Sequence, residues 1–281
     1  LPVPMLRRIL KAVGPDLVVC TNSPRAERAA VVAARQLGIP SICLVDLFAI
    51  DEVKWIGARD YADQVCVLND SVRQFLLAAG RSEEQVVVTG NPGFDALNAP
   101  SAVTRGRQIR EERGWVHRRV ILWPMQVEPA FHPFDGRPGD PSLPQRALAA
   151  VEQWVLARAD CVLCIRPRAG EILTDVCTDT RILVTGQDWP LAPLLHAADA
   201  VVTLNSTVGL EGHLAGCRQI QVLGSVFDHA MPLARFGIAD AAVPVDEISG
   251  ALDRWIDAPR LETHEQSSAA ERVLAVMGKF L

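Results

Sequence analysis

Short apolar runs alternate with helical segments along most of the chain, and this alternation limits the folds it can adopt. The runs LVVC (17–20), ICLV (42–45), VILW (120–123) and AVV (200–202) have no polar residue. Strands that are buried on both faces have this composition, and parallel strands need a long connection that is usually a helix. The pattern therefore predicts an α/β protein whose parallel sheets are covered by helices on both faces.

The alternation is interrupted once, over residues 98–118, which are polar and poor in apolar positions. We interpret this stretch as the crossing between two Rossmann-like, doubly wound domains that face each other across a cleft. The predicted organisation is a first domain over 1–100, a second over 115–262 and a closing helix over 263–281. The first domain opens with a helix and has about four strands, so we expect earlier βα units to be missing from it.

Local signals place the ends of several helices. The Ala-rich helix after the first strand is predicted to be capped at Ser23, with Pro24 at its first position and Gly38 at its end. The helix after the third strand is predicted to be capped by Asp70 or Ser71.

Composition excludes several classes of function. The net charge is −5 and no strongly basic block is present, so nucleic acid is not an expected partner. No apolar run approaches the roughly 20 residues that span a bilayer. Cys161 and Cys164 have CxxC spacing but lie within one strand-like run, and no second pair accompanies them. We therefore expect reduced, buried cysteines in the cytoplasm and no metal site.

The segment TLNSTVGLEG (203–212) changes from a strand into a helix, and it is the strongest candidate binding site. A helix N-terminus has unpaired N–H groups and partial positive charge, which suit a phosphate. Ser206 and Thr207 add hydroxyl groups, and Glu211 lies one helical turn after Thr207, where it can accept hydrogen bonds from ribose. Simple helix capping by Ser206 explains the same residues equally well.

Two further segments follow predicted strands. Arg166 and Arg168 lie on one face of a strand end, where guanidinium groups can bind phosphate or carboxylate, although surface pairing with Glu171 or Asp160 is the alternative. The long loop after Gln126 contains His132, a candidate general acid or base. Four more residues are candidates by position: Glu128 and Asp135 in this loop, and Asp228 and His229 in a later loop.

Two of these segments carry a family resemblance. ADAVVTLNSTVGLEGHLAGCRQIQVLG resembles the nucleotide-sugar-binding segment of GT-B-fold glycosyltransferases, most closely the bacterial capsule-polysaccharide group that includes Kdo transferases. VVVTGNPGFDAL is similar to the end of the first domain in that group and in UDP-N-acetylglucosamine 2-epimerases. The resemblance extends in strand order from about Pro15 to Gly224. The epimerases have Gly-Gly and a paired Glu-Glu in this helix, whereas this chain has Thr207-Val208-Gly209 and the single Glu211.

The resemblance implies transfer of a sugar from a nucleotide-sugar to a saccharide or glycolipid acceptor, without a metal or other cofactor. No DxD triplet stands out, which agrees with that expectation. Such a protein acts in the cytoplasm, and a glycolipid acceptor would bring it to the inner face of the membrane. A UDP-sugar 2-epimerase or hydrolase, or a non-catalytic binding protein, remains the alternative. The implied donor-binding residues are Gln126, Arg166, Arg168, Asn205, Ser206, Thr207 and Glu211.

An inverting transferase also needs a base that takes the proton of the acceptor hydroxyl. Asp46 ends a first-domain strand and is the candidate, together with His132; Asp51 and Glu52 follow closely, and the sequence gives no basis for choosing among the carboxylates. Asn91 and Asp95 lie in a Gly- and Pro-containing turn, for which we expect a structural role.

Overall fold

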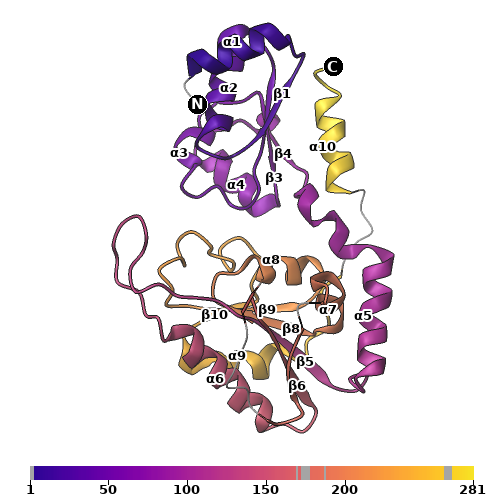
Figure 1. The fold of residues 1–281 in the computed structure, drawn as a ribbon. Coiled ribbons are helices and arrows are strands. Elements are labelled where there is room, and N and C mark those ends of the chain that lie inside the picture. The colour runs from indigo at the N-terminus through magenta and orange to yellow at the C-terminus, as the bar shows by residue number, and fades with distance from the viewer. Residues whose placement is uncertain (1–2, 169, 172–177, 187, 263–267) are drawn as a thin grey trace. The chain divides into compact units, whose positions relative to one another are not determined.

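A computed structural model describes residues 3–168, 170–171, 178–186, 188–262 and 268–281 (Figure 1). The chain forms two compact units. The first comprises Leu1–Asp95 and Glu265–Leu281, and the second comprises Ala96–His264. Within the described residues, no helix is both long and apolar enough to cross a bilayer.

The first unit contains a four-stranded parallel sheet in the order β1-β2-β3-β4. Its strands are β1 (Val18–Thr21), β2 (Ser41–Leu44), β3 (Gln64–Val67) and β4 (Val86–Val88). Its helices are α1 (Val3–Val13), α2 (Ala26–Leu37), α3 (Val53–Ile56), α4 (Asp70–Ala78) and the C-terminal α10 (Ala269–Met277), with 3-10 turns η1 (Glu83–Gln85) and η2 (Pro92–Asn98), the latter continuing into the second unit.

Two predicted helix starts in this unit are wrong. Helix α2 begins at Ala26 rather than directly after Ser23, because Arg25 has a non-helical backbone and Pro24 lies in a preceding turn. Helix α4 is capped by Asn69, whose side-chain oxygen accepts a hydrogen bond from the N–H of Val72 at 3.0 Å. The predicted end of α2 is confirmed, since Gly38 adopts a left-handed conformation with φ of 71°.

The second unit contains a six-stranded parallel sheet in the order β10-β9-β8-β5-β6-β7. Its strands are β5 (Arg119–Pro124), β6 (Cys161–Arg166), β7 (Ile182–Val184), β8 (Ala200–Thr203), β9 (Arg218–Val222) and β10 (Ala241–Val243). Its helices are α5 (Pro100–Glu112), α6 (Leu143–Leu156), α7 (Leu191–Ala197), α8 (Thr207–Leu214) and α9 (Ile248–Trp255), with the 3-10 turn η3 (Val245–Glu247).

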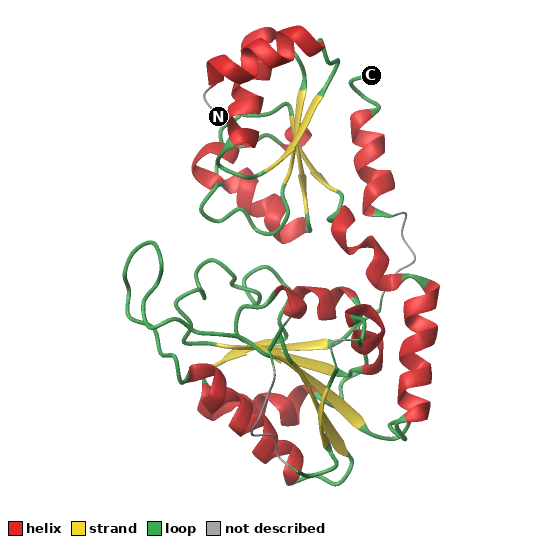
Figure 2. Ribbon diagram, in the orientation of Figure 1, coloured by secondary structure: helices red, strands yellow, loops and turns green. Residues whose placement is uncertain are grey.

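Helices α6 and α9 cover one face of this sheet, and α7 and α8 cover the other (Figures 1 and 2). An extensive apolar core lies between the sheet and the α6–α9 layer, and Trp123 and Trp154 are buried in it. The α/β class with two parallel sheets is therefore confirmed. The order of strand addition reverses within the second sheet. Strands β6 and β7 are added on one side of β5, and β8, β9 and β10 are added on the other.

The polar stretch 98–118, predicted as a crossing, forms α5, which belongs to the second unit. Its low hydropathy reflects a narrow buried face, which consists of Ala102, Gly106 and Ile109. Arg110 fixes the helix to the sheet, because its guanidinium donates to the carbonyl of Ala197 at 2.7 Å and to the carboxylate of Asp199 at 3.0 Å.

The predicted closing helix is α10, which is part of the first unit. Residues 263–267 of that prediction lie outside the described residues. Val273 and Val276 of α10 pack with Ile42 of β2 and Cys66 of β3 in a small apolar core.

Candidate functional site

The second sheet has a topological switch point between β5 and β8, because the chain leaves these neighbouring strands in opposite directions. In open α/β sheets, ligands bind outside the carboxyl ends of the strands at such a point. The residues that follow the strands here are Gln126 after β5, Asn205 after β8 and Ser225 after β9, with Arg166 at the end of β6. Residues that are far apart in the sequence thus come to one edge of one sheet.

Helix α8 begins at this edge. Ser206 is its N-cap, and its hydroxyl oxygen accepts a hydrogen bond from the N–H of Val208 at 3.2 Å. The capping role that the sequence allowed is therefore present. Thr207, the first helical residue, is exposed. The N–H of Gly209 donates to the carbonyl of Ser206 at 3.0 Å, so among the described residues of this first turn the N–H of Thr207 is the one that remains for a ligand.

Glycine allows α8 to lie close to the sheet. A Cβ atom added to Gly209 would be 2.8 Å from Cγ2 of Thr203 and 2.9 Å from Cδ1 of Leu233. One added to Gly212 would be 2.8 Å from Cγ2 of Val201. The small residues of TVGLEG thus place the N-terminus of α8 against the end of β8.

Glu211 and Arg166 form the charged part of this edge. Glu211 is half-buried, and burial raises the pKa of its carboxyl, while a hydrogen bond from Thr207 and the charge of Arg166 oppose that increase. Burial likewise lowers the pKa of Arg166, and the charge of Glu211 opposes that decrease. The Arg166 guanidinium donates to the carbonyl of Trp189 at 2.7 Å, which holds it in place. Thr207, Glu211 and Arg166 are therefore brought together.

Arg168 has different surroundings from Arg166. Its backbone N–H and its Nε both lie 3.2 Å from the Glu171 carboxylate, and more than half of its side chain is exposed. The surface pairing with Glu171 that the sequence allowed is present.

Gln126 and Asn205 bridge the switch point directly. The side-chain oxygen of Gln126 accepts the backbone N–H of Asn205 at 3.0 Å, and its Nε2 donates to the carbonyl of Pro124 at 3.2 Å. The Asn205 side chain donates through Nδ2 to Oγ of Ser225 at 2.6 Å. These hydrogen bonds link the loops that follow β5, β8 and β9 to one another.

The loop after β5 forms a hairpin, with Phe131 paired to Pro138. His132 lies in this hairpin: its Nδ1 is 2.9 Å from Oδ1 of Asp135, and its ring centroid is 5.4 Å from that of Phe227. The side chain of His132 is thus held within the loops, with Asp135 as its described polar partner.

Asp228 lies in the loop after β9. One of its carboxylate oxygens accepts the N–H of Gly224 at 2.7 Å, and the other is buried without a partner among the described residues. Burial raises the pKa of its carboxyl, and the charge of Glu128 adds to that increase. Its neighbour His229 is exposed.

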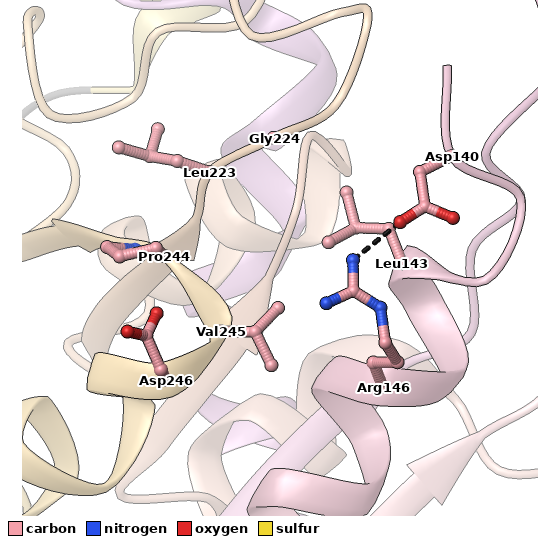
Figure 3. Close-up of a pocket in the computed structure, with 8 residues that line it drawn as sticks. All are labelled: Asp140, Leu143, Arg146, Leu223, Gly224, Pro244, Val245 and Asp246. Carbon is pink, nitrogen blue, oxygen red and sulfur yellow. Dashed lines mark hydrogen bonds and ion pairs between the residues drawn. The ribbon is translucent and has the colours of Figure 1, made fainter.

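A cavity of about 370 Å³ lies beside the candidate site, where β9 and β10 end near the start of α6 (Figure 3). Leu143, Leu223 and Val245 give it an apolar lining, and Asp140 pairs with Arg146 at 2.5 Å on one side. None of the predicted site residues lines this cavity. Within the described part of the chain, no group of His, Cys, Asp and Glu is arranged to hold a metal ion.

Comparisons with known proteins identify the architecture. No family model matches the chain, and no curated protein matches it in sequence. The UDP-GlcNAc 2-epimerase of Neisseria meningitidis bound to UDP-GlcNAc is similar over 99% of this chain and 80% of its own, with TM-score 0.63 and 11% identity. S. aureus MnaA with UDP is similar over 99% and 78%, with TM-score 0.61 and 15% identity. Anabaena HepE in complex with UDP and glucose is similar over 98% and 77%, with TM-score 0.51 and 15% identity.

The chain has the GT-B fold. Its first GT-B unit carries the predicted base, Asp46, which is exposed directly after β2 and accepts the N–H of Leu47 through Oδ1 at 2.9 Å. Glu52 is close to it, and burial raises the pKa of the Glu52 carboxyl, with smaller increases from the charges of Asp51 and Asp46. Between them Ala49 has φ of 52°, a conformation that non-glycine residues rarely adopt.

Asn91 and Asp95 have structural roles in this first GT-B unit. The Asn91 side chain donates to the carbonyl of Asp46 at 2.9 Å, so it shapes the loop that carries the predicted base. The carboxylate of Asp95 accepts the N–H groups of Ala269 and Ala270 at 2.7 and 2.9 Å, which caps α10.

The buried contact between Glu128 and Ser225 is not predicted by the sequence. Glu128 is a candidate only by its position in a loop, and Ser225 is not among the candidates. They are 97 residues apart, and nothing in the local pattern of either indicates the other. The one available signal is that Glu128 stands between apolar residues and proline in the short segment VEPAF (127–131).

Proposed function

We propose that the protein binds a nucleotide-sugar at the start of α8 and transfers its sugar to a saccharide or glycolipid acceptor. The observation that carries this proposal is the position of Thr207, Glu211 and Arg166 together at the switch point of the second sheet. The GT-B fold agrees with it, as does the resemblance of TLNSTVGLEG to the donor-binding segment of capsule-polysaccharide glycosyltransferases.

In this proposal the diphosphate lies in front of the first turn of α8. The N–H of Thr207 and the hydroxyl of Ser206 donate to phosphate oxygens, the Thr207 hydroxyl turns its proton from Glu211 to a phosphate oxygen, and Arg166 supplies a full positive charge. The same groups stabilise the negative charge that develops on the diphosphate as the bond between the sugar and phosphate breaks. Glu211 accepts hydrogen bonds from ribose hydroxyls.

The acceptor hydroxyl attacks the anomeric carbon, and a carboxylate of the first unit takes its proton. Asp46 is the proposed base. Glu52 is the alternative, because its raised pKa brings it closer to the range in which a general base is effective. The bond between the anomeric carbon and the phosphate oxygen breaks, and its electron pair leaves with the nucleotide. The step therefore needs no further reactant.

A thermal-shift panel of UDP, CMP, CDP and GDP tests donor binding. A nucleotide at 100 times its dissociation constant stabilises the folded state by about 2.7 kcal/mol. The double variant Ser206→Ala/Thr207→Ala is expected to lose that shift. Ser268→Ala is the matched control, because Ser268 is also a helix N-cap whose hydroxyl accepts a backbone N–H, and it lies in the other unit. An unchanged shift in the double variant would remove Ser206 and Thr207 from the site.

UDP-GlcNAc 2-epimerisation is the second candidate, favoured by the structural likeness to epimerases bound to UDP-GlcNAc. Incubation with UDP-GlcNAc and no acceptor separates the two. An epimerase or hydrolase forms product under these conditions, whereas a strict transferase forms almost none. Nucleotide binding without turnover with any acceptor would instead indicate a binding protein.

A further inference from the structure

Glu128 is a buried carboxylate that the proposed reaction does not use. Only 2% of its surface is exposed. Its Oε2 accepts the hydroxyl of Ser225 at 2.7 Å, and its Oε1 accepts the N–H of Val226 at 2.8 Å. Burying a charge is costly unless hydrogen bonds compensate it, so this placement calls for an explanation.

Ser225 fixes the direction of the hydrogen bonds that lead away from Glu128. Its Oγ accepts from Nδ2 of Asn205 at 2.6 Å and from the N–H of Phe227 at 3.0 Å. A hydroxyl has two acceptor sites and one proton. Both acceptor sites are therefore occupied, and the proton of Ser225 must point to Glu128.

The orientation of the Asn205 amide follows from the number of hydrogen bonds that the Ser225 hydroxyl can accept and donate. Its NH₂ group must face Ser225, so its oxygen, Oδ1, faces the other way. Asn205 is half-buried. Its Oδ1 reaches solvent, and none of the described residues donates a hydrogen bond to it. Asn205 directly precedes the N-cap of α8, and its backbone is held by Gln126. The chain thus presents a fixed hydrogen-bond acceptor at the edge of the proposed donor site.

We propose that Glu128 is a positioning residue that acts through Ser225 to hold the Asn205 oxygen toward the bound nucleotide-sugar, where it accepts a hydrogen bond from an N–H or O–H group. This inference rests on the proposed function. An amide oxygen repels phosphate oxygens, so Asn205 selects a donor group of the nucleoside or of the sugar and does not bind the diphosphate.

The polarity of this hydrogen-bond chain can be reversed by substitution. In Glu128→Gln the new NH₂ group donates to Ser225, whose proton then turns to Asn205, and the Asn205 amide must rotate and present its NH₂ group. In Asn205→Asp two carboxylates compete for the single proton of Ser225. In the double variant Glu128→Gln/Asn205→Asp, that proton goes to the carboxylate introduced at position 205, and an oxygen again faces the ligand.

The first measurement is thermal unfolding of these three variants without ligand. Asn205→Asp is expected to lower the melting temperature, and adding Glu128→Gln is expected to restore much of the loss. Glu111→Gln on α5 is the control, because Glu111 is exposed and has no ion pair among the described residues. Additive changes in melting temperature would show that Glu128 does not set the orientation of Asn205, which would overturn the inference.

The second measurement is titration with UDP and with UDP-GlcNAc. Glu128→Gln is expected to weaken binding by about tenfold, and the double variant is expected to bind within about threefold of the unchanged protein. If both ligands lose affinity equally, the donor group belongs to the nucleoside. If only UDP-GlcNAc loses affinity, it belongs to the sugar. Equal affinity of all variants would contradict the inference.

Ser225→Ala provides an independent test if Glu128→Gln does not fold. It removes the hydroxyl that fixes the Asn205 amide, so binding of UDP-GlcNAc should weaken. Affinity equal to that of the unchanged protein would overturn the inference. If the unchanged protein binds neither ligand, the proposed function fails, and the unfolding measurements still decide whether Glu128 orients Asn205.

Discussion

Arg166 and Arg168 are two positions apart at the end of β6, but their surroundings differ. The Arg166 guanidinium is held by the carbonyl of Trp189 and lies near Glu211, whereas Arg168 pairs with Glu171 at the surface. An arginine that is already ordered loses less conformational entropy when it binds a ligand. Arg166 is therefore the residue on which diphosphate binding should depend more strongly.

We expect Arg166→Ala to weaken UDP binding by about ten- to a hundredfold, the usual loss for a hydrogen bond to a charged group. Arg168→Ala should cost much less. Because the charge of Arg166 lowers the pKa of Glu211, its removal should raise that pKa further. Binding that needs ionised Glu211 should then weaken at a higher pH than in the unchanged protein. Calorimetric titration at several pH values measures both effects, and equal losses in the two variants would argue against the assignment.

His213 of α8 predicts a pH dependence of stability. Burial lowers the pKa of its imidazole, and Nδ1 has no partner among the described residues. The unfolded chain, with a pKa near about 6.5, therefore binds a proton more readily than the folded protein. The free energy of unfolding should fall as the pH drops below that value, until the folded state is protonated as well.

His213→Gln should reduce this dependence, measured as the slope of unfolding free energy against pH between about 7 and 5. His229→Gln is the control, because His229 is exposed in the same unit. A slope that changes equally in both variants would show that the burial of His213 is not the cause.

At the scale of elements, the position of α8 depends on its close approach to the sheet. Gly209 has Thr203 and Leu233 within 3 Å of where its Cβ would be, and the side chain of Thr203 is branched at Cβ and has little freedom to move. A helix displaced from the sheet would move its N-terminal N–H groups relative to Arg166 and Asn205. The same small residues therefore serve packing and the proposed binding site.

Gly209→Ala should destabilise the protein by about 1–3 kcal/mol, the usual cost of overpacking, and should also weaken UDP binding. Gly250→Ala on α9 is the matched control, since no atom lies within 4 Å of its added Cβ. Alanine favours helices more than glycine, so this control should be neutral or stabilised by up to about 1 kcal/mol. Chemical denaturation compares the two, and a neutral Gly209→Ala variant would contradict the packing argument.

Periodicity and turn chemistry allow most strands and helices of this protein to be predicted, because continuous apolar runs and glycine stops are local signals. The start of α2 is an exception, because Pro24 and Arg25 form a separate turn before Ala26. Helix α5 escapes prediction because only three of its residues are buried. At the candidate site the sequence indicates the start of α8, but the link from Asn205 through Ser225 to Glu128 depends on long-range folding that no local pattern records.

At the scale of the whole molecule, the chain returns to its first unit at its end. Helix α10 packs Val273 and Val276 against Ile42 and Cys66, and Arg272 donates to the carbonyl of Thr89 at 2.8 Å. Each buried valine contributes on the order of 1.5–3 kcal/mol. The stability of the first unit therefore depends on residues that are distant in sequence from its strands.

A chain that ends at residue 262 should lose stability in its first unit while its second unit still binds UDP. The reason is that the residues of the switch point all lie between Gln126 and Ser225, within the second unit. Calorimetry should compare the full chain with the shortened chain. Only the unfolding transition of the first unit should change, and the transition of the second unit should still shift to higher temperature when UDP is added.

A single substitution tests the contribution of the α10 cap to stability without removing the apolar contacts of that helix. Asp95→Ala leaves the N–H groups of Ala269 and Ala270 without their acceptor, which should cost about 0.5–2 kcal/mol. Asp16→Ala is the control, because Asp16 is exposed in the same unit. Hydrogen exchange should then accelerate in α10 and in the strands it contacts, β2 and β3, while α8 exchanges as before. Faster exchange in α8 would instead mean that the two units unfold together, and that the C-terminal helix stabilises the proposed nucleotide site as well.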